Sequence, residues 1–206
     1  MTALSPLQVL AFCNFVAAIA FTPGPNNAIA SMTGLNFGWR AALPQALGVA
    51  CGCALLFCIT AAGVGALVTA LPGSSWVLTL GGAAYLAWLG WGFLRTHASA
   101  ATAKVARPPR FHEAVLFQGM NPKAWIASLG GSSAWLASSQ VSVKVTLLLA
   151  TLYALICLPS VLTWAVAGAM FRGRLEGAGL NWFNRGAGVL LLITAGWMVI
   201  ENLNAT

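Results

Sequence analysis

The stretch FTPGPNN, residues 21–27, interrupts an apolar run that extends from residue 5 to residue 37. Its two prolines cannot both lie inside a helix, because proline lacks the N–H group and clashes with the preceding turn. We expect a new helix to begin with Gly24 as its cap and Pro25 at its first position, where proline fits. The run therefore predicts a first helix that is broken near its middle.

A second break lies in the other half of the chain, in the apolar run from residue 112 to residue 138. There Asn121 suits the cap position of a helix and Pro122 suits its first turn. The two breaks belong to an internal repeat, because PNNAIASMTG at residues 25–34 matches PKAWIASLGG at residues 122–131. We interpret this match as the relic of a duplication.

Charged residues are scarce, since 59% of the 206 residues are hydrophobic and only 6% are charged. A soluble domain needs roughly a quarter of its residues charged to cover its surface. A helix of about 20 apolar residues crosses the hydrocarbon core of a bilayer. The sequence therefore predicts an all-α membrane protein with six transmembrane helices, the first and fourth broken at the proline motifs. The predicted spans are residues 5–37, 42–70, 76–95, 112–138, 144–171 and 185–203.

The basic residues indicate how these spans are oriented. Lys and Arg mark cytoplasmic loops, and with six spans loops 95–112 and 172–185 lie inside while both termini lie outside. The inner loops then hold eight Lys or Arg residues and the outer loops hold one, Lys144. The net charge of +7 thus reflects topology in a bacterial inner membrane, and we expect the lipid bilayer as a partner and no nucleic acid. If the first segment is instead re-entrant, the N-terminus changes side.

The number of spans also predicts the symmetry of the chain. Three spans per half is an odd number, so two halves in series must lie in opposite orientations. We expect one transporter domain over residues 1–206, with inverted repeats at about 1–95 and 112–206 and a cytoplasmic linker at about 96–111. Many secondary transporters share this plan and bind their substrate at the repeat interface.

The two breaks form the candidate site for substrate binding or gating. Unwound backbone at membrane depth needs partners from protein or from a water-filled cavity, and the free N–H groups at a helix start suit an anion. Lys123 is the only charge well inside a span, where charges are costly and usually functional. Alternatively, its long stem reaches to the cytoplasmic interface. The candidate residues are Thr22, Pro23, Gly24, Pro25, Asn26, Asn27, Asn121, Pro122 and Lys123.

A second tier of candidates consists of polar residues inside the spans: Asn14, Ser31, Gln118 and Ser128. The repeat makes Ser31 and Ser128 equivalent, so both are candidates for one cavity, although hydrogen bonds between helices also explain such residues. Amide groups both donate and accept hydrogen bonds. The whole set suits a zwitterion, with its carboxylate on N–H groups and its ammonium on oxygens. We expect no catalytic residue and therefore no enzyme.

Five cysteines lie in apolar stretches, where small buried side chains serve helix packing. Two further functions remain open. A metal-ion exporter would need carboxylate, His or Cys ligands, and a thiol/disulfide electron carrier would need paired or low-pKa cysteines at symmetric positions. The break motifs contain no cysteine and the spans contain no deep carboxylate. We therefore expect neither a metal nor a cofactor.

The paired motifs, TPGPN at residues 22–26 after a first apolar span and NPK at residues 121–123 opening the fourth, resemble the lysine-exporter (LysE/RhtB) family of amino acid exporters. Chain length, six spans and the basic mid-chain loop agree with this family. The Asn26-Asn27 doublet is most similar to the cysteine and O-acetylserine exporter branch. The resemblance implies export of amino acids or close derivatives from the cytoplasm, driven by the proton-motive force, with both motifs as the functional core.

The resemblance leaves the substrate and the proton path open. The absence of a buried acid favours a small neutral or polar amino acid over a dibasic one. A proton relay would run through Lys123, His112, Glu113 or Glu201, or through water. The pattern Gly48-x-x-x-Gly52 fits a close helix contact, either within one protomer or in a homodimer.

Overall fold

The computed structural model describes residues 4–63, 74–95, 107–136, 142–172 and 178–205. Throughout these residues the regular structure is helical, which confirms the all-α prediction. The elements are α1 (Pro6–Phe21), α2 (Pro25–Phe37), the short 3-10 helix η1 (Trp39–Ala42), α3 (Leu43–Ala61), α5 (Ser74–Leu94), α6 (Phe111–Met120), α7 (Pro122–Leu136), α8 (Val143–Met170) and α9 (Ala178–Ala205).

Both helix breaks occur where the prolines predict them. Helix α1 ends at Phe21, α2 begins at Pro25, and the two axes differ by 57°. Gly24 is the cap of α2, in extended backbone that leaves Pro25 at the first helical position. Asn121 separates α6 from α7, with φ −94° and ψ 108°. Proline chemistry is local, which is why the sequence placed these breaks correctly.

Apolar helices long enough to cross a bilayer are present in the described part of the chain. Residues Trp39–Ala61 and Val143–Met170 qualify as single helices, and the bent pair α1–α2 makes a third if it is one span. The other predicted spans remain predictions, and residues 64–70 of the second lie outside the described residues. Helix α9 begins at Ala178, before the predicted span at 185, because a helix can continue beyond the apolar segment that crosses the bilayer.

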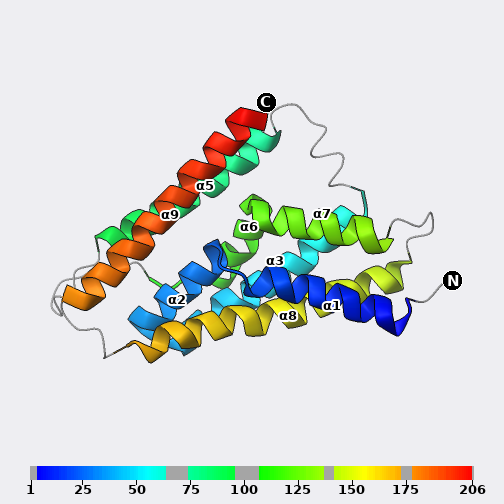
Figure 1. Ribbon diagram of the computed structural model, residues 1–206, viewed down its shortest axis with the longest axis horizontal. Coiled ribbons are helices and arrows are strands. Elements are labelled where there is room, and N and C mark those ends of the chain that lie inside the picture. Colours follow the sequence, from blue (N-terminus) through cyan, green and yellow to red (C-terminus); the bar gives the residue numbers. More distant parts are fainter. Residues whose placement is uncertain (1–3, 64–73, 96–106, 137–141, 173–177, 206) are drawn as a thin grey trace.

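Helices α3 and α8 pack against each other, with α1–α2 packed on α8 and α6–α7 packed on α3; in Figure 1, α8 runs along the lower edge of the molecule. Figure 1 shows α5 and α9 as a separate pair that lies side by side along one flank. The larger buried apolar cluster joins α1, α3 and α8 through residues such as Phe12, Phe57 and Tyr153. The Phe12 and Phe57 rings meet edge to face, with centroids 5.5 Å apart. The broken helices are therefore held against the packed pair α3 and α8.

Glycines allow α2 to approach α8 until the backbones touch. A Cβ atom added to Gly34 would lie 1.9 Å from the Ala165 carbonyl oxygen, and one added to Gly168 would lie 1.9 Å from the Ser31 carbonyl oxygen. The Ser31 hydroxyl also donates a hydrogen bond of 3.0 Å to the Trp164 carbonyl oxygen. A side chain larger than hydrogen therefore does not fit at either glycine.

Residues matched by the internal repeat have matching neighbours in the fold. Ser31 and Gly34 of α2 contact α8, as described above. Their equivalents on α7 contact α3, because the Thr60 hydroxyl donates to the Ser128 carbonyl oxygen at 3.2 Å and Gly131 lies against the Phe57 ring. Each of the two matched segments thus packs on a long helix from the other half of the chain, α2 on α8 and α7 on α3.

The Gly48-x-x-x-Gly52 pattern has a contact within one protomer. A Cβ atom added to Gly48 would lie 2.3 Å from the Phe111 carbonyl oxygen, and one added to Gly52 would lie 3.0 Å from that of Val115. Both glycines therefore bring α3 close to α6, which explains the pattern without a second copy of the chain.

Candidate functional site

The two helix breaks meet, although 101 residues separate Thr22 from Lys123. The Lys123 ammonium nitrogen donates to the Thr22 carbonyl oxygen at 2.8 Å, to the Thr22 hydroxyl at 2.9 Å and to the Pro23 carbonyl oxygen at 3.4 Å. These carbonyls belong to the unwound segment and have no helical N–H partner. Lys123 therefore supplies hydrogen-bond donors to the unwound backbone of the first break.

Gly24 leaves room for this contact. A Cβ atom at Gly24 would lie 3.0 Å from the Lys123 ammonium nitrogen and 3.2 Å from its Cδ atom. Gly24 also caps α2 without a side-chain hydrogen bond to the first turn. The start of α2 thus offers N–H groups and the positive end of its dipole beside the Lys123 ammonium, an arrangement that favours an anion.

Deeper in the protein, a pair of side-chain amides connects the two breaks. The Asn26 amide donates to Gln118 Oε1 at 2.9 Å, and the Gln118 amide donates back to Asn26 Oδ1 at 3.3 Å. Gln118 Oε1 also accepts the Cys53 thiol at 3.7 Å. Gln118 is only 1% exposed, and buried polar groups require such partners because an unpaired one is costly. This second-tier candidate is therefore a structural part of the site.

Carbonyls at the end of α1 and in the first break are bound by side chains from α2 and α8. The Asn27 amide donates to the carbonyl oxygens of Ala20 and Thr22, at 2.9 and 2.8 Å. The Ser160 hydroxyl of α8 donates to the same Ala20 oxygen at 2.7 Å. On the other break, Asn121 Oδ1 accepts the Lys123 backbone N–H at 3.1 Å and so caps α7 as predicted.

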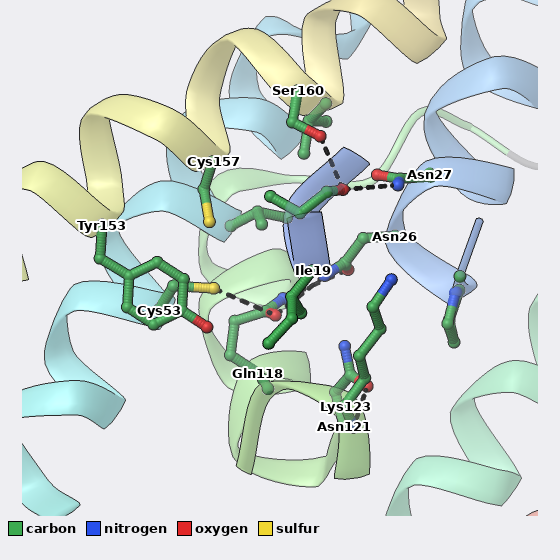
Figure 2. Close-up of a pocket in the computed structure, with 16 residues that line it drawn as sticks. Ile19, Asn26, Asn27, Cys53, Gln118, Asn121, Lys123, Tyr153, Cys157 and Ser160 are labelled. Atoms are coloured by element: carbon green, nitrogen blue, oxygen red, sulfur yellow. Dashed lines mark hydrogen bonds between the residues drawn. The ribbon is translucent and has the colours of Figure 1, made fainter. Parts of the chain in front are cut away.

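These polar groups surround an open pocket, whose empty space together with the open solvent at its mouth is about 450 Å³. Figure 2 shows the pocket between α1, α2, α3, α6, α7 and α8. The lining residues are Ile19, Ala20, Gly24, Pro25, Asn26, Asn27, Val49, Cys53, Gln118, Asn121, Lys123, Ala124, Tyr153, Cys157, Ser160 and Val161.

Most of the predicted site residues line this pocket or support it. Thr22, Pro23 and Pro122 are not among the lining residues, but the first two bind Lys123 and Pro122 begins α7. Three second-tier residues lie elsewhere: Asn14 is exposed on α1, Ser31 bonds α8, and Ser128 is fully buried between α7 and α3.

Sequence reasoning missed the wall that α3 and α8 contribute. Cys53, Tyr153, Cys157 and Ser160 line the pocket, yet each stands in an unbroken apolar run. The available signal was helical spacing, because Tyr153 and Cys157 are four residues apart and share one face of α8. All cysteines had been interpreted as packing residues, and for Cys53 and Cys157 that interpretation is incomplete.

The charge of the pocket comes from one residue. Of the residues described as lining it, Lys123 is the one that carries a formal charge. Glu113, considered as a proton relay, instead forms an ion pair with Arg107 at the start of α6 and does not line the pocket. No group of three or more His, Cys, Asp or Glu residues able to hold a metal occurs in the described part of the chain. The pocket therefore suits an anionic or zwitterionic small molecule.

The family model described as LysE type translocator matches residues 17–202, a range that includes both breaks and every residue of the pocket. This chain belongs to the LysE family. The resemblance seen in the paired motifs is thereby confirmed, and this LysE-family chain is a membrane transporter and not an enzyme.

Named relatives place this LysE-family chain near the branch of the cysteine/O-acetylserine efflux proteins. It is 31% identical over 206 residues to the cysteine/O-acetylserine efflux protein of Klebsiella pneumoniae, covering 96% of this chain and all of the relative. It is 25% identical over 169 residues to the proteins of the same name from Shigella flexneri and Escherichia coli K12, covering 82% of this chain and 86% of each relative. No solved structure matches the chain.

Proposed function

We propose that this LysE-family chain exports a small neutral or polar amino acid, or a close derivative, from the cytoplasm across the bacterial inner membrane. The observation that carries the proposal is the meeting of the two helix breaks around one pocket, with a single ammonium group beside an open helix start. The relatives are named for efflux of cysteine and O-acetylserine, so these two compounds are the first candidate substrates.

The pocket provides partners for both charges of an amino acid. The substrate carboxylate would bind the Lys123 ammonium and the N–H groups at the start of α2. The substrate ammonium would bind amide and backbone oxygens, such as the side-chain oxygens of Asn26 and Asn121, which both line the pocket. The Lys123 ammonium donates hydrogen bonds to the Thr22 and Pro23 carbonyls. A bound carboxylate would therefore compete with these carbonyls for the Lys123 ammonium.

This competition gives a route from binding to conformational change. A carboxylate that withdraws Lys123 frees the backbone of the first break, which then needs new partners. A ligand shifts a conformational equilibrium only through such differential contacts. We propose that the released break tilts α1–α2 against α8, so that the pocket opens to the opposite side of the membrane.

We further propose that six spans form two inverted repeats, with both termini outside and loops 95–112 and 172–185 in the cytoplasm. The matched neighbours of Ser31 and Ser128 on α8 and α3 support the repeat. A reporter enzyme active only outside the cytoplasm should therefore be active when fused after Thr206 and inactive when inserted near residue 104. Activity at both positions, or the reverse pattern, contradicts this topology.

Transport itself is tested by expressing the chain in bacteria and quantifying amino acids in the medium by mass spectrometry. We expect a small group of neutral amino acids or O-acetylserine to rise above the level of cells carrying the empty vector. We also propose that the proton-motive force drives export, so an uncoupler should abolish the rise. An unchanged medium, with folded protein abundant in the membrane, would refute the proposed function.

A further inference from the structure

The pocket has two ends of different chemistry. One end contains Lys123, Asn121 and the start of α2, where charged and backbone groups gather. The opposite end is formed by α3 and α8, and Figure 2 shows Cys53, Tyr153 and Cys157 there, with Ile19 and Gln118 between the two ends. A substrate whose carboxylate binds at the first end must direct its side chain toward the second.

Helical spacing produces this second end. Val49 and Cys53 are four residues apart on α3, as Tyr153 and Cys157 are on α8, so each helix presents one pair on one face. All four residues line the pocket. Cys53, Tyr153 and Cys157 are 4%, 4% and 5% exposed. The pair on α3 and the pair on α8 therefore form one continuous, buried wall of the pocket.

Packing and hydrogen bonding hold this wall in place. The Tyr153 ring meets the Phe57 ring edge to face, with centroids 6.1 Å apart. The Cys53 thiol is directed by its bond to Gln118 Oε1 at 3.7 Å, and Gln118 is tied to Asn26 in the first break. The wall is thus part of the same connected structure as the polar end, and its side chains have little freedom to move away from a ligand.

The chemistry of the wall restricts what side chain it accepts. Thiols are small, polarisable groups that form only weak hydrogen bonds, and none of the wall residues carries a formal charge. An ionised side chain would lose its water there without gaining a partner of opposite charge, which is costly. A short, neutral and polarisable side chain meets no such penalty.

We propose that Cys53, Tyr153 and Cys157 form the side-chain subsite of this transporter and determine which amino acids it carries. The inference rests on the proposed function and deepens it by assigning selection to these three residues. Lys123 and the two breaks bind the carboxylate and ammonium groups that all amino acids share. The wall selects among substrates by the length and charge of their side chains.

The test uses purified full-length protein in proteoliposomes loaded with L-cysteine under reducing conditions, with radiolabelled L-cysteine, L-leucine and L-ornithine outside. Wild type should exchange cysteine far better than the other two. Replacing both wall thiols, Cys53→Ala with Cys157→Ala, removes two sulfur atoms and enlarges the pocket at this end. The leucine-to-cysteine exchange ratio should then rise about tenfold, which is the scale of one methylene group in an apolar pocket. Cys157→Asp should make ornithine a substrate.

Matched controls come from the other cysteines of α3. Cys51 is exposed, and neither Cys51 nor Cys58 lines the pocket, so the double variant Cys51→Ala with Cys58→Ala should keep the wild-type ratio. If Cys157→Asp does not fold, the leucine-to-cysteine exchange ratio of the double alanine variant still tests the proposed subsite. Exchange by wild type with ratios unchanged in the wall variants would overturn the subsite. Absence of any exchange by wild type, or of any amino acid rise in the cell assay, would instead count against the proposed function.

Discussion

Replacing Lys123 with methionine should reduce export about 10- to 100-fold while the protein still reaches the membrane. A charge-assisted hydrogen bond contributes roughly 1.5–3 kcal/mol, and about 1.4 kcal/mol corresponds to a tenfold change. Methionine keeps the length of the stem but removes the ammonium that binds Thr22 and Pro23. The measurement is the initial rate of amino acid release from preloaded cells, normalised to protein in the membrane.

The control for this variant is Lys144→Met. Lys144 is exposed near the start of α8, outside the pocket, so its loss removes the same charge without touching the site. Release by Lys144→Met should match wild type. If both methionine variants transport equally well, Lys123 is not part of the substrate site and the alternative role at the membrane interface regains support. Lys123→Arg should keep the charge but misplace it, so we expect intermediate release.

Replacing Gly34 with leucine should prevent α2 from packing on α8. A side chain at this position meets the Ala165 backbone, with only 1.9 Å between the new Cβ atom and the carbonyl oxygen. Overpacking of this kind costs about 1–3 kcal/mol or more, and backbone atoms cannot rotate away as a side chain can. We expect a loss of monodisperse protein after detergent extraction, or a Tm lower by several degrees.

Gly196→Leu provides the contrast, because no atom lies within 4 Å of a Cβ atom added at Gly196 of α9. Leucine is the better helix former by about 0.5–1 kcal/mol, so this variant should equal or slightly exceed wild type in Tm. The same Tm for both leucine variants would mean that the close approach of α2 to α8 does not contribute to stability. Gly168→Leu should reproduce the Gly34 result from the other side of the contact.

Local chemistry accounts for what could be predicted. The breaks at Pro25 and Pro122 follow from the missing N–H group and the ring of proline, and each requires only its own neighbourhood in the sequence. The apolar helices follow from composition in the same way. Asn121 was correctly assigned as a cap because its role depends on the backbone N–H two residues later.

The candidate site was partly predictable for the same reason. Helix breaks in an apolar chain need compensation, so Asn26, Asn27, Asn121 and Lys123 could be singled out before their partners were known. Asn14 carried the same signal, a polar group in an apolar run, yet it is exposed on α1. A single polar residue in a helix does not reveal which way it faces when both sides of the helix are apolar.

The sequence by itself determined the helices, their two interruptions and the family to which the chain belongs, because each depends on short motifs and on hydropathy. Only the tertiary structure decided that Lys123 binds Thr22, that Gln118 pairs with Asn26 and that Cys53, Tyr153 and Cys157 complete the pocket. The physical reason is distance along the chain. The Asn26–Gln118 and Thr22–Lys123 contacts join residues 92 and 101 positions apart, and such contacts depend on how whole helices pack rather than on any local preference.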